Sequence, residues 1–173
     1  AKNGTKPWRN TGYKFPVTIV TGDLQYKGFN NNLIVRGNAV YGNLGASGAL
    51  TTINNSSSAA SGYPNTTVAQ NAVSYGGEAG YNIGSFFHSK APRIYPFIRY
   101  EYYNPMEKTE ANTGLLADKR FQVSAVTAGL NYYALPNLVI KADYTHRSIG
   151  GGKYNDENLV SVGIAYIGWF IKK

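Results

Sequence analysis

Charged and amide side chains recur at every second position along several segments of this chain, and this spacing is its clearest chemical signal. A period of two places such residues on one face of an extended strand, opposite a second set of residues. Ionised groups cannot lie unpaired in a dry core, so we expect water on their face. The candidate residues are Arg36, Asn38, Glu78, Arg99, Glu101, Lys141, Asp143 and Arg147.

Residues for covalent or metal chemistry are sparse. His88 falls in a predicted short turn and His146 near the opposite end of a strand, so the two are expected to lie far apart. The segment 148–153 (SIGGGK) lacks the Ser or Thr that follows the lysine in a phosphate loop. The chain has no cysteine and no metal-ligand spacing. We therefore expect no catalytic residues, no metal site, no cofactor and no enzyme activity.

The composition fits one domain of an unusual kind. The chain has 173 residues, of which 15% are charged, with 15 tyrosines and 20 glycines. Ordinary soluble domains have about 25% charged residues. No apolar run reaches the roughly 18 residues of a transmembrane helix. The net charge of +8 is scattered along the chain, which argues against a nucleic-acid partner.

Alternating segments predict seven strands, at 12–26, 31–44, 70–84, 92–104, 119–133, 137–148 and 157–170. Their connections alternate between short ones (27–30, 85–91, 134–136) and long ones (45–69, 105–118, 149–156) rich in small polar residues. Short turns at one end and long loops at the other are typical of an outer-membrane barrel. We expect Pro96 to cause a β-bulge, and the faces of residues 20–26 are ambiguous.

The last segment favours the same fold class. Val160, Val162, Ile164 and Tyr166 share one apolar face, and Trp169 and Phe170 follow as aromatics. An apolar outer face edged by aromatics is typical of a transmembrane strand. The sequence thus predicts an all-β, transmembrane antiparallel β-barrel in the outer membrane of a Gram-negative bacterium. Its partners would be outer-membrane lipid and small hydrophilic solutes.

Strand parity predicts that these are the C-terminal strands of a larger barrel. Seven strands would place the chain before residue 12 outside the cell, whereas bacterial barrels have even strand numbers and start in the periplasm. We expect 1–11 to be an extracellular loop remnant, 12–170 the strands of the single domain 1–173, and 171–173 a tail. About sixteen or more strands would leave an aqueous channel. The alternative is a complete barrel of eight strands, with 1–10 as a ragged first strand.

Four segments carry a family resemblance: NNLIVRGNAVYGNLG, YGGEAGYNIGSF, YPFIRYEYYNP and VTAGLNYYALPNLVIKADY. With the closing aromatic strand, they resemble the C-terminal half of Gram-negative porins of the phosphate-selective porin O/P family, over about residues 24–170. The resemblance implies a barrel, usually of sixteen or more strands, that passes small solutes passively. The phosphate specificity does not carry over, and the residues after Phe170 depart from the family pattern.

Two functions follow as expectations. The first is a passive, water-filled porin whose eight candidate residues line the pore, with a weak preference for anions. The second is a structural barrel that anchors or accompanies a larger envelope complex or assembles with copies of itself. For the basic residues Arg36, Arg99, Lys141 and Arg147, we weigh a role in anion selectivity against simple pairing with neighbouring carboxylates. The loop 45–69 could fold inward and narrow a pore, or remain an external loop.

Overall fold

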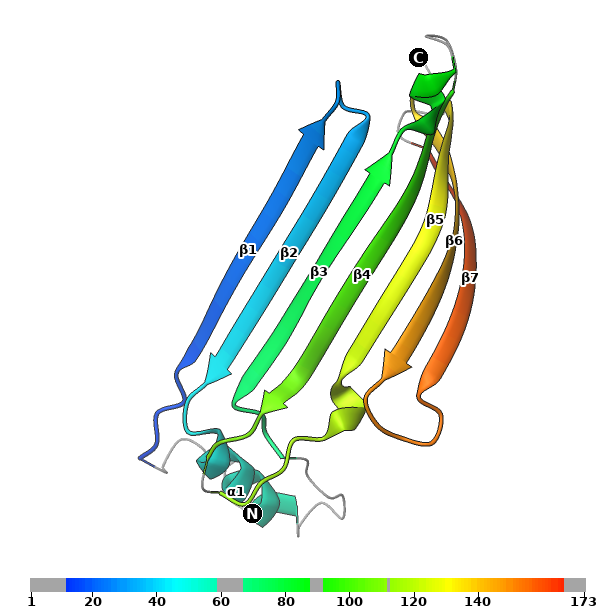
Figure 1. Cartoon of the computed structure of the whole chain (residues 1–173). Coiled ribbons are helices and arrows are strands. Elements are labelled where there is room, and N and C mark those ends of the chain that lie inside the picture. Colours follow the sequence, from blue (N-terminus) through cyan, green and yellow to red (C-terminus); the bar gives the residue numbers. More distant parts are fainter. Residues whose placement is uncertain (1–11, 59–66, 88–91, 112, 167–173) are drawn as a thin grey trace, which may run out of the picture.

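The computed structural model describes residues 12–58, 67–87, 92–111 and 113–166. These residues form one antiparallel sheet of seven strands, in which each strand pairs with the next along the chain (Figure 1). The strands are β1 (Val17–Gly28), β2 (Leu33–Leu44), β3 (Asn71–Tyr81), β4 (Arg93–Lys108), β5 (Val123–Leu135), β6 (Leu138–Ile149) and β7 (Asp156–Tyr166). The prediction of an all-β fold with seven strands is confirmed, with strand ends shifted by a few residues.

The connections are sorted by length between the two ends of the sheet, as expected. Short turns join β1 to β2 and β5 to β6, and the link from β3 to β4 contains the 3-10 helix η2 (Ile83–Phe86). The opposite end, which is lower in Figure 1, carries helix α1 (Ser47–Ser58) after β2 and the 3-10 helix η3 (Lys119–Phe121) before β5. We call these the short-turn end and the long-loop end.

The short-turn end is tied together by a buried asparagine. The Asn82 side chain is 7% exposed, accepts a hydrogen bond from the amide of Ile94 and donates one to the side chain of Asn32. Phe29, Asn30 and Asn31 all have positive φ in the β1–β2 turn. Such backbone is strained for most residues other than glycine, although asparagine tolerates it best. The chain therefore reverses direction here through a turn with strained backbone.

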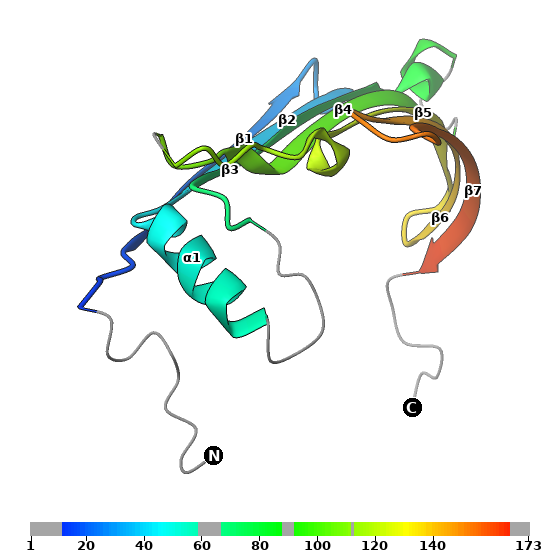
Figure 2. The ribbon, with the colours of Figure 1, turned by 90° about the horizontal axis from the view of Figure 1, so that it is seen from below.

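Figure 2 shows the sheet as an arch, with α1 beneath it. The sheet is not closed among the described residues, where β1 and β7 each pair with one neighbour only. No helix in the described ranges is long and apolar enough to cross a membrane. The predicted loop remnant 1–11, the end of the last strand from 167 onward and the tail 171–173 lie outside the described residues.

Two local expectations need correction. Pro96 causes no bulge, because it pairs with Leu130 in an unbroken β4–β5 register and lies just beyond Phe97, the last β4 residue in register with β3. The irregular pairing of β4 occurs instead toward the long-loop end, between Asn71 and Val73 of β3. The first strand begins at Val17, directly after Pro16, rather than at residue 12.

The sheet has almost no interior of its own. Among the described residues, Met106 and Val123 are the only buried hydrophobic side chains. By contrast Val160, Val162 and Ile164 are 73%, 75% and 72% exposed. A soluble sheet normally buries one face against a second layer. No such layer covers this sheet in the described part of the chain, so its function must be sought in what its two faces meet.

Candidate functional site

The strand register separates the side chains of the sheet into two chemically different faces. Directly paired residues in neighbouring strands share a face, and alternate residues along a strand do as well. The face that carries Arg36, Glu78 and Arg99 is called the polar face here, and the face that carries Val35, Ile98 and Val160 the apolar face. All eight candidate residues from the sequence fall on the polar face.

One row of the polar face crosses the sheet at mid-strand. Arg36 pairs with Glu78, and Glu78 pairs with Arg99. The Arg99 Nε donates to the Glu78 carboxylate at 2.9 Å, and its terminal nitrogen lies 2.8 Å from the same oxygen. A terminal nitrogen of Arg36 lies 3.8 Å from the other Glu78 oxygen. The Glu78 carboxylate on β3 therefore interacts with guanidinium groups from both flanking strands, β2 and β4.

The neighbouring row, toward the long-loop end, continues this pairing. Its members are Asp23, Asn38, Gly76, Glu101, Ala125, Arg147 and Glu157. Arg147 is 3.0 Å from the carboxylate of Glu157 and donates to the hydroxyl of Tyr103 at 3.3 Å. Glu101 lies 3.9 Å from Arg99. Arg36, Arg99 and Arg147 thus each lie near a glutamate, in line with the pairing interpretation, whereas Lys141 and Asp143 take no part in the ion pairs of the described residues.

The structure brings six of the eight candidate residues together and leaves two apart. Arg36, Asn38, Glu78, Arg99 and Glu101 line a hollow of about 630 Å³. Arg147 lines a second hollow of about 350 Å³ together with Asn38 and Glu101. Lys141 and Asp143 lie further along β6 on the same face. None of the ion pairs between described residues involves Lys141 or Asp143.

Sequence reasoning missed two groups of polar-face residues. Asp23 and Gln25 also line the hollow, because β1 pairs with β2 without a break and the register resolves the ambiguous faces of 20–26. The second group is aromatic and comprises Tyr95, Phe97, Tyr103 and Tyr133. Tyr95, Phe97 and Tyr103 alternate with the apolar-face residues of β4 as Arg99 does, and this spacing was a usable signal. The more numerous tyrosines of the other face dominate the pattern and hide it.

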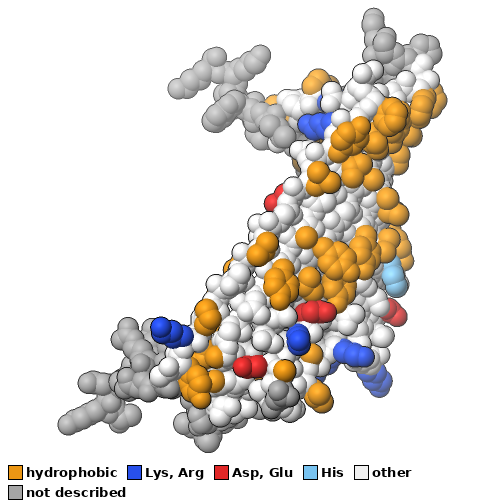
Figure 3. Space-filling view, turned by 60° about the vertical axis from the view of Figure 1, so that its left-hand side comes forward, with side chains coloured by type: hydrophobic (Ala, Val, Ile, Leu, Met, Phe, Trp, Pro, Cys, Tyr) orange, Lys and Arg blue, Asp and Glu red, His pale blue; other side chains and the backbone are white. Residues whose placement is uncertain are grey.

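The apolar face carries hydrophobic side chains along most of its length (Figure 3). Each strand presents two or more of them, and this face also carries seven tyrosines: Tyr75, Tyr81, Tyr100, Tyr102, Tyr132, Tyr144 and Tyr166. Two of them, Tyr75 and Tyr102, stack with ring centroids 5.0 Å apart. Among paired residues of β5, β6 and β7, Asp156 is the only Asp, Glu, Lys or Arg on this face, and it is the first residue of β7.

The loop 45–69 contains a docked helix, so neither simple expectation describes it fully. The carboxylate of Glu110, in the β4–β5 connection, accepts a hydrogen bond from the Gly48 amide at the start of α1. The Thr51 hydroxyl accepts from the amide of Val68 at 2.9 Å, and Ser47 and Thr51 are fully buried. These contacts attach the helix to a second long loop, and in Figure 2 it lies beneath the arch.

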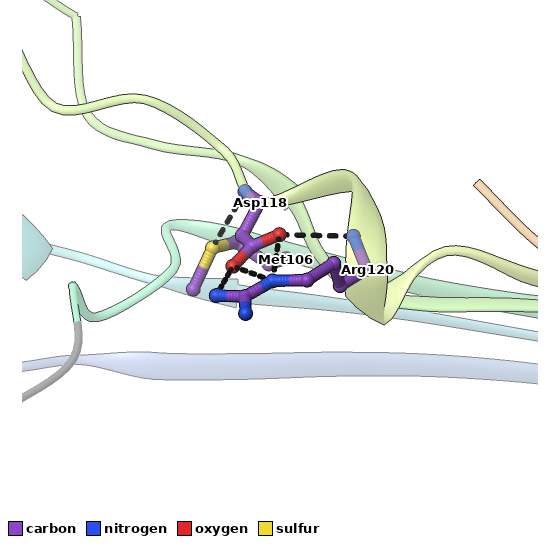
Figure 4. A network of polar contacts seen from close by, with 3 residues as sticks. All are labelled: Met106, Asp118 and Arg120. Atoms are coloured by element: carbon purple, nitrogen blue, oxygen red, sulfur yellow. Dashed lines mark hydrogen bonds and ion pairs between the residues drawn. The ribbon is translucent and has the colours of Figure 1, made fainter. Parts of the chain in front are cut away.

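The β4–β5 connection has its own polar cluster at the start of η3 (Figure 4). The Asp118 side chain accepts from the Arg120 amide at 2.9 Å and from its guanidinium. The Asp118 amide donates to the sulfur of Met106 at 3.1 Å. The hydrogen-bonded Arg120 guanidinium holds the pKa of the Asp118 carboxyl below its ordinary value. These contacts hold the β4–β5 connection against Met106 of β4.

Two further searches bear on the site. The described ranges contain no group of three or more His, Cys, Asp or Glu side chains placed to hold a metal ion. Comparisons with family models, curated proteins and solved structures found no match to this chain. The account of function below therefore rests on the two faces of the sheet.

Proposed function

We propose that this sheet is part of the wall of an outer-membrane β-barrel of a Gram-negative bacterium. The barrel would give passive, water-filled diffusion to small hydrophilic solutes. The observation that carries the proposal is the separation of the two faces. From β1 to β7 the charged side chains gather on one face, which also carries Ile19, Val40 and Leu159, whereas the other face is hydrophobic and almost free of charge among the described strands.

Lipid is the medium that suits the apolar face. Exposed apolar patches on soluble monomers seldom exceed a few hundred Å². Here the exposed hydrophobic residues continue from Val20 and Leu24 on β1 to Val162 and Ile164 on β7. Tyrosines toward the strand ends are suited to the boundary between lipid and water. In lipid the face requires no second protein layer.

Water is the medium that suits the polar face. The side chains of Arg36, Arg99 and Glu101 are 58%, 40% and 53% exposed even within their ion pairs. A small barrel would have to pack these groups into its interior, whereas a wide barrel leaves them hydrated. Further strands, from the same chain or from another, would close the sheet, since the open edges of β1 and β7 would leave backbone groups unpaired in lipid.

The pairing of charges limits how selective such a pore can be. Glu78 neutralises much of the field of Arg36 and Arg99, and Glu157 does the same for Arg147. Outside the ion pairs of the described residues, this face carries Lys27, Arg93 and Lys141 against the two carboxylates of Asp23 and Asp143, so its excess of positive charge is small. This excess favours anions, but water screens it over about 8–10 Å at physiological salt. We therefore propose a weak preference for anions, which fades as salt concentration rises.

Conductance tests the proposal directly. The whole protein, purified folded from outer membranes, is inserted into a planar bilayer under a KCl gradient. We expect ohmic channels with a reversal potential slightly displaced toward that of chloride, and a smaller displacement in concentrated salt. Heat-denatured protein is the control. A folded protein that inserts but conducts no ions would instead support the structural barrel, and clear cation selectivity would contradict the assignment of the polar face.

A further inference from the structure

An aromatic and basic cluster lies on the polar face at the short-turn end, apart from the hollow. Arg93 of β4 pairs with Tyr133 of β5, and its guanidinium carbon lies 4.7 Å from the centre of the Tyr133 ring. The rings of Tyr95 and Tyr133 meet edge to face, with centroids 5.7 Å apart. The hydroxyl of Tyr95 donates to the backbone oxygen of Asn31 at 3.3 Å. These contacts fix both rings and the guanidinium relative to one another.

Two neighbours extend the cluster. Tyr95 of β4, Asn131 of β5 and Lys141 of β6 form one cross-strand row. Lys141 therefore lies two strands from Tyr95, on the strand next to that of Tyr133. Phe97 occupies the next row, where it faces Gly129. A Cβ at Gly129 would lie 2.6 Å from the Phe97 ring, so the ring rests directly on the glycine backbone. The result is a strip of aromatic surface next to two cationic residues.

The cations of this cluster differ from Arg36, Arg99 and Arg147 because no carboxylate of a described residue lies within ion-pair distance of them. Arg36, Arg99 and Arg147 each lie within 4 Å of a glutamate. Arg93 instead donates weakly to the Pro136 carbonyl at 3.5 Å, and neither Arg93 nor Lys141 takes part in the ion pairs found between described residues. Asp143 shares the row of Phe97 and Gly129 and offsets part of this charge, so Arg93 and Lys141 together leave a net positive charge beside the aromatic rings.

We propose that Arg93, Tyr95, Tyr133 and Lys141, with Phe97, form a binding site for small aromatic carboxylates. A guanidinium stacked on a ring keeps its N–H groups directed sideways, where they can bind a carboxylate through two hydrogen bonds. The fixed rings offer a surface for the aromatic part of the solute. Two unpaired cations and several rings suit a monoanion with an apolar ring better than they suit phosphate, which would leave the rings unused.

The proposal rests on the proposed function, because it places solutes on the polar face. The test therefore measures binding of small anions to the whole protein in detergent, by saturation-transfer NMR and calorimetry. Conductance is measured separately. The probes are benzoate, cyclohexanecarboxylate, acetate and inorganic phosphate. Stacking is worth about 0.5–1.5 kcal/mol, so we expect benzoate to bind roughly 2- to 12-fold more tightly than acetate at the 1.4 kcal/mol per tenfold conversion.

Variants assign the site. Arg93→Gln should weaken benzoate binding by about tenfold or more, because it removes a charge-assisted pair of hydrogen bonds. Tyr133→Leu should abolish the advantage of benzoate over acetate. Lys153→Gln removes a cation from the hairpin between β6 and β7, at the other end of the sheet, and should change nothing. Retention of the folded band on an unheated gel shows that each variant is assembled.

The outcomes separate this proposal from the function. Equal binding of benzoate and acetate, tighter binding of phosphate, or unchanged binding in Arg93→Gln would overturn the aromatic carboxylate site even if the protein conducts. Benzoate binding that depends on Arg93 and Tyr133 in a protein that forms no channel would uphold the site and refute the pore.

Discussion

Ser161 and Val162 are neighbours on β7 that belong to opposite faces, which makes them a matched pair for testing the assignment of the faces. Val162 pairs with Ala142 on the apolar face, near the middle of the strand, and is 75% exposed. Ser161 pairs with Asp143 on the polar face. An arginine at either position places the same charged side chain on the same strand.

The expected costs differ widely. An arginine facing lipid near the midplane of a barrel costs about 2–4 kcal/mol, which lowers the folding equilibrium constant by roughly 30- to 700-fold at 1.4 kcal/mol per tenfold. Val162→Arg should therefore be strongly destabilised. Ser161→Arg would face water opposite Asp143, where a cross-strand ion pair contributes about 0.2–1 kcal/mol in favour of folding. Tyr166→Arg, at the strand end, should cost about 0–1 kcal/mol.

The assay is folding into lipid vesicles over a urea series, followed by the shift of the folded band on an unheated gel. The predicted order of stability is Ser161→Arg above Tyr166→Arg above Val162→Arg. Equal losses for Ser161→Arg and Val162→Arg would refute the assignment of the two faces. A cost that does not depend on position between Val162 and Tyr166 would refute a lipid environment for the apolar face.

Three further changes test the polar face and its supports. Glu78→Gln should release the two arginines it holds and move the reversal potential further toward chloride; an unchanged potential would mean that these arginines do not face the pore. Gly129→Ala should lower stability by about 1–3 kcal/mol, because the new methyl group overlaps the Phe97 ring. In the control Gly163→Ala the new methyl group meets nothing within 4 Å, so this variant should be as stable as the parent. Urea titration compares the two variants, and equal stabilities would contradict the packing of Phe97 on Gly129. The lowered pKa of Asp118 means that its hydrogen-bonded carboxylate stabilises the loop above the ordinary pKa of 3.8, and that this contribution is lost as the pH falls through the lowered pKa. Amide hydrogen exchange in η3 should speed up as the pH falls through that range. Exchange that follows only the intrinsic pH dependence would refute this role of Asp118.

The strands could be predicted because each one repeats the same two-residue alternation. Leu33 to Tyr41 on β2 and Val160 to Tyr166 on β7 both alternate between the two faces, and the short and long connections fix an antiparallel meander. The pattern therefore placed all eight candidate residues on one face. Whether Lys141 or Arg36 touches a carboxylate depends on register between strands, which no single strand encodes.

The misses have local physical reasons. Pro96 lies just beyond the part of β4 that pairs with β3. Its missing N–H therefore removes no hydrogen bond between these two strands, and no bulge forms. The faces of β1 near Gly22 were ambiguous because Thr21 and Asp23 interrupt the apolar alternation, and only pairing with Val40 and Asn38 of β2 resolves them. The attachment of helix α1 to the β4–β5 connection involves Glu110, and sequence spacing does not reveal this contact.

The central claim is that water lies on one face of the sheet and lipid on the other, and thiol labelling tests it most directly. The chain has no cysteine, so a single introduced thiol reports alone. Asn38 and Ala39 are adjacent on β2, both exposed, and on opposite faces. In intact outer membranes, a charged maleimide should modify Asn38→Cys and leave Ala39→Cys unmodified, and both should react after denaturation. Equal labelling of the two thiols in the folded protein would contradict the account.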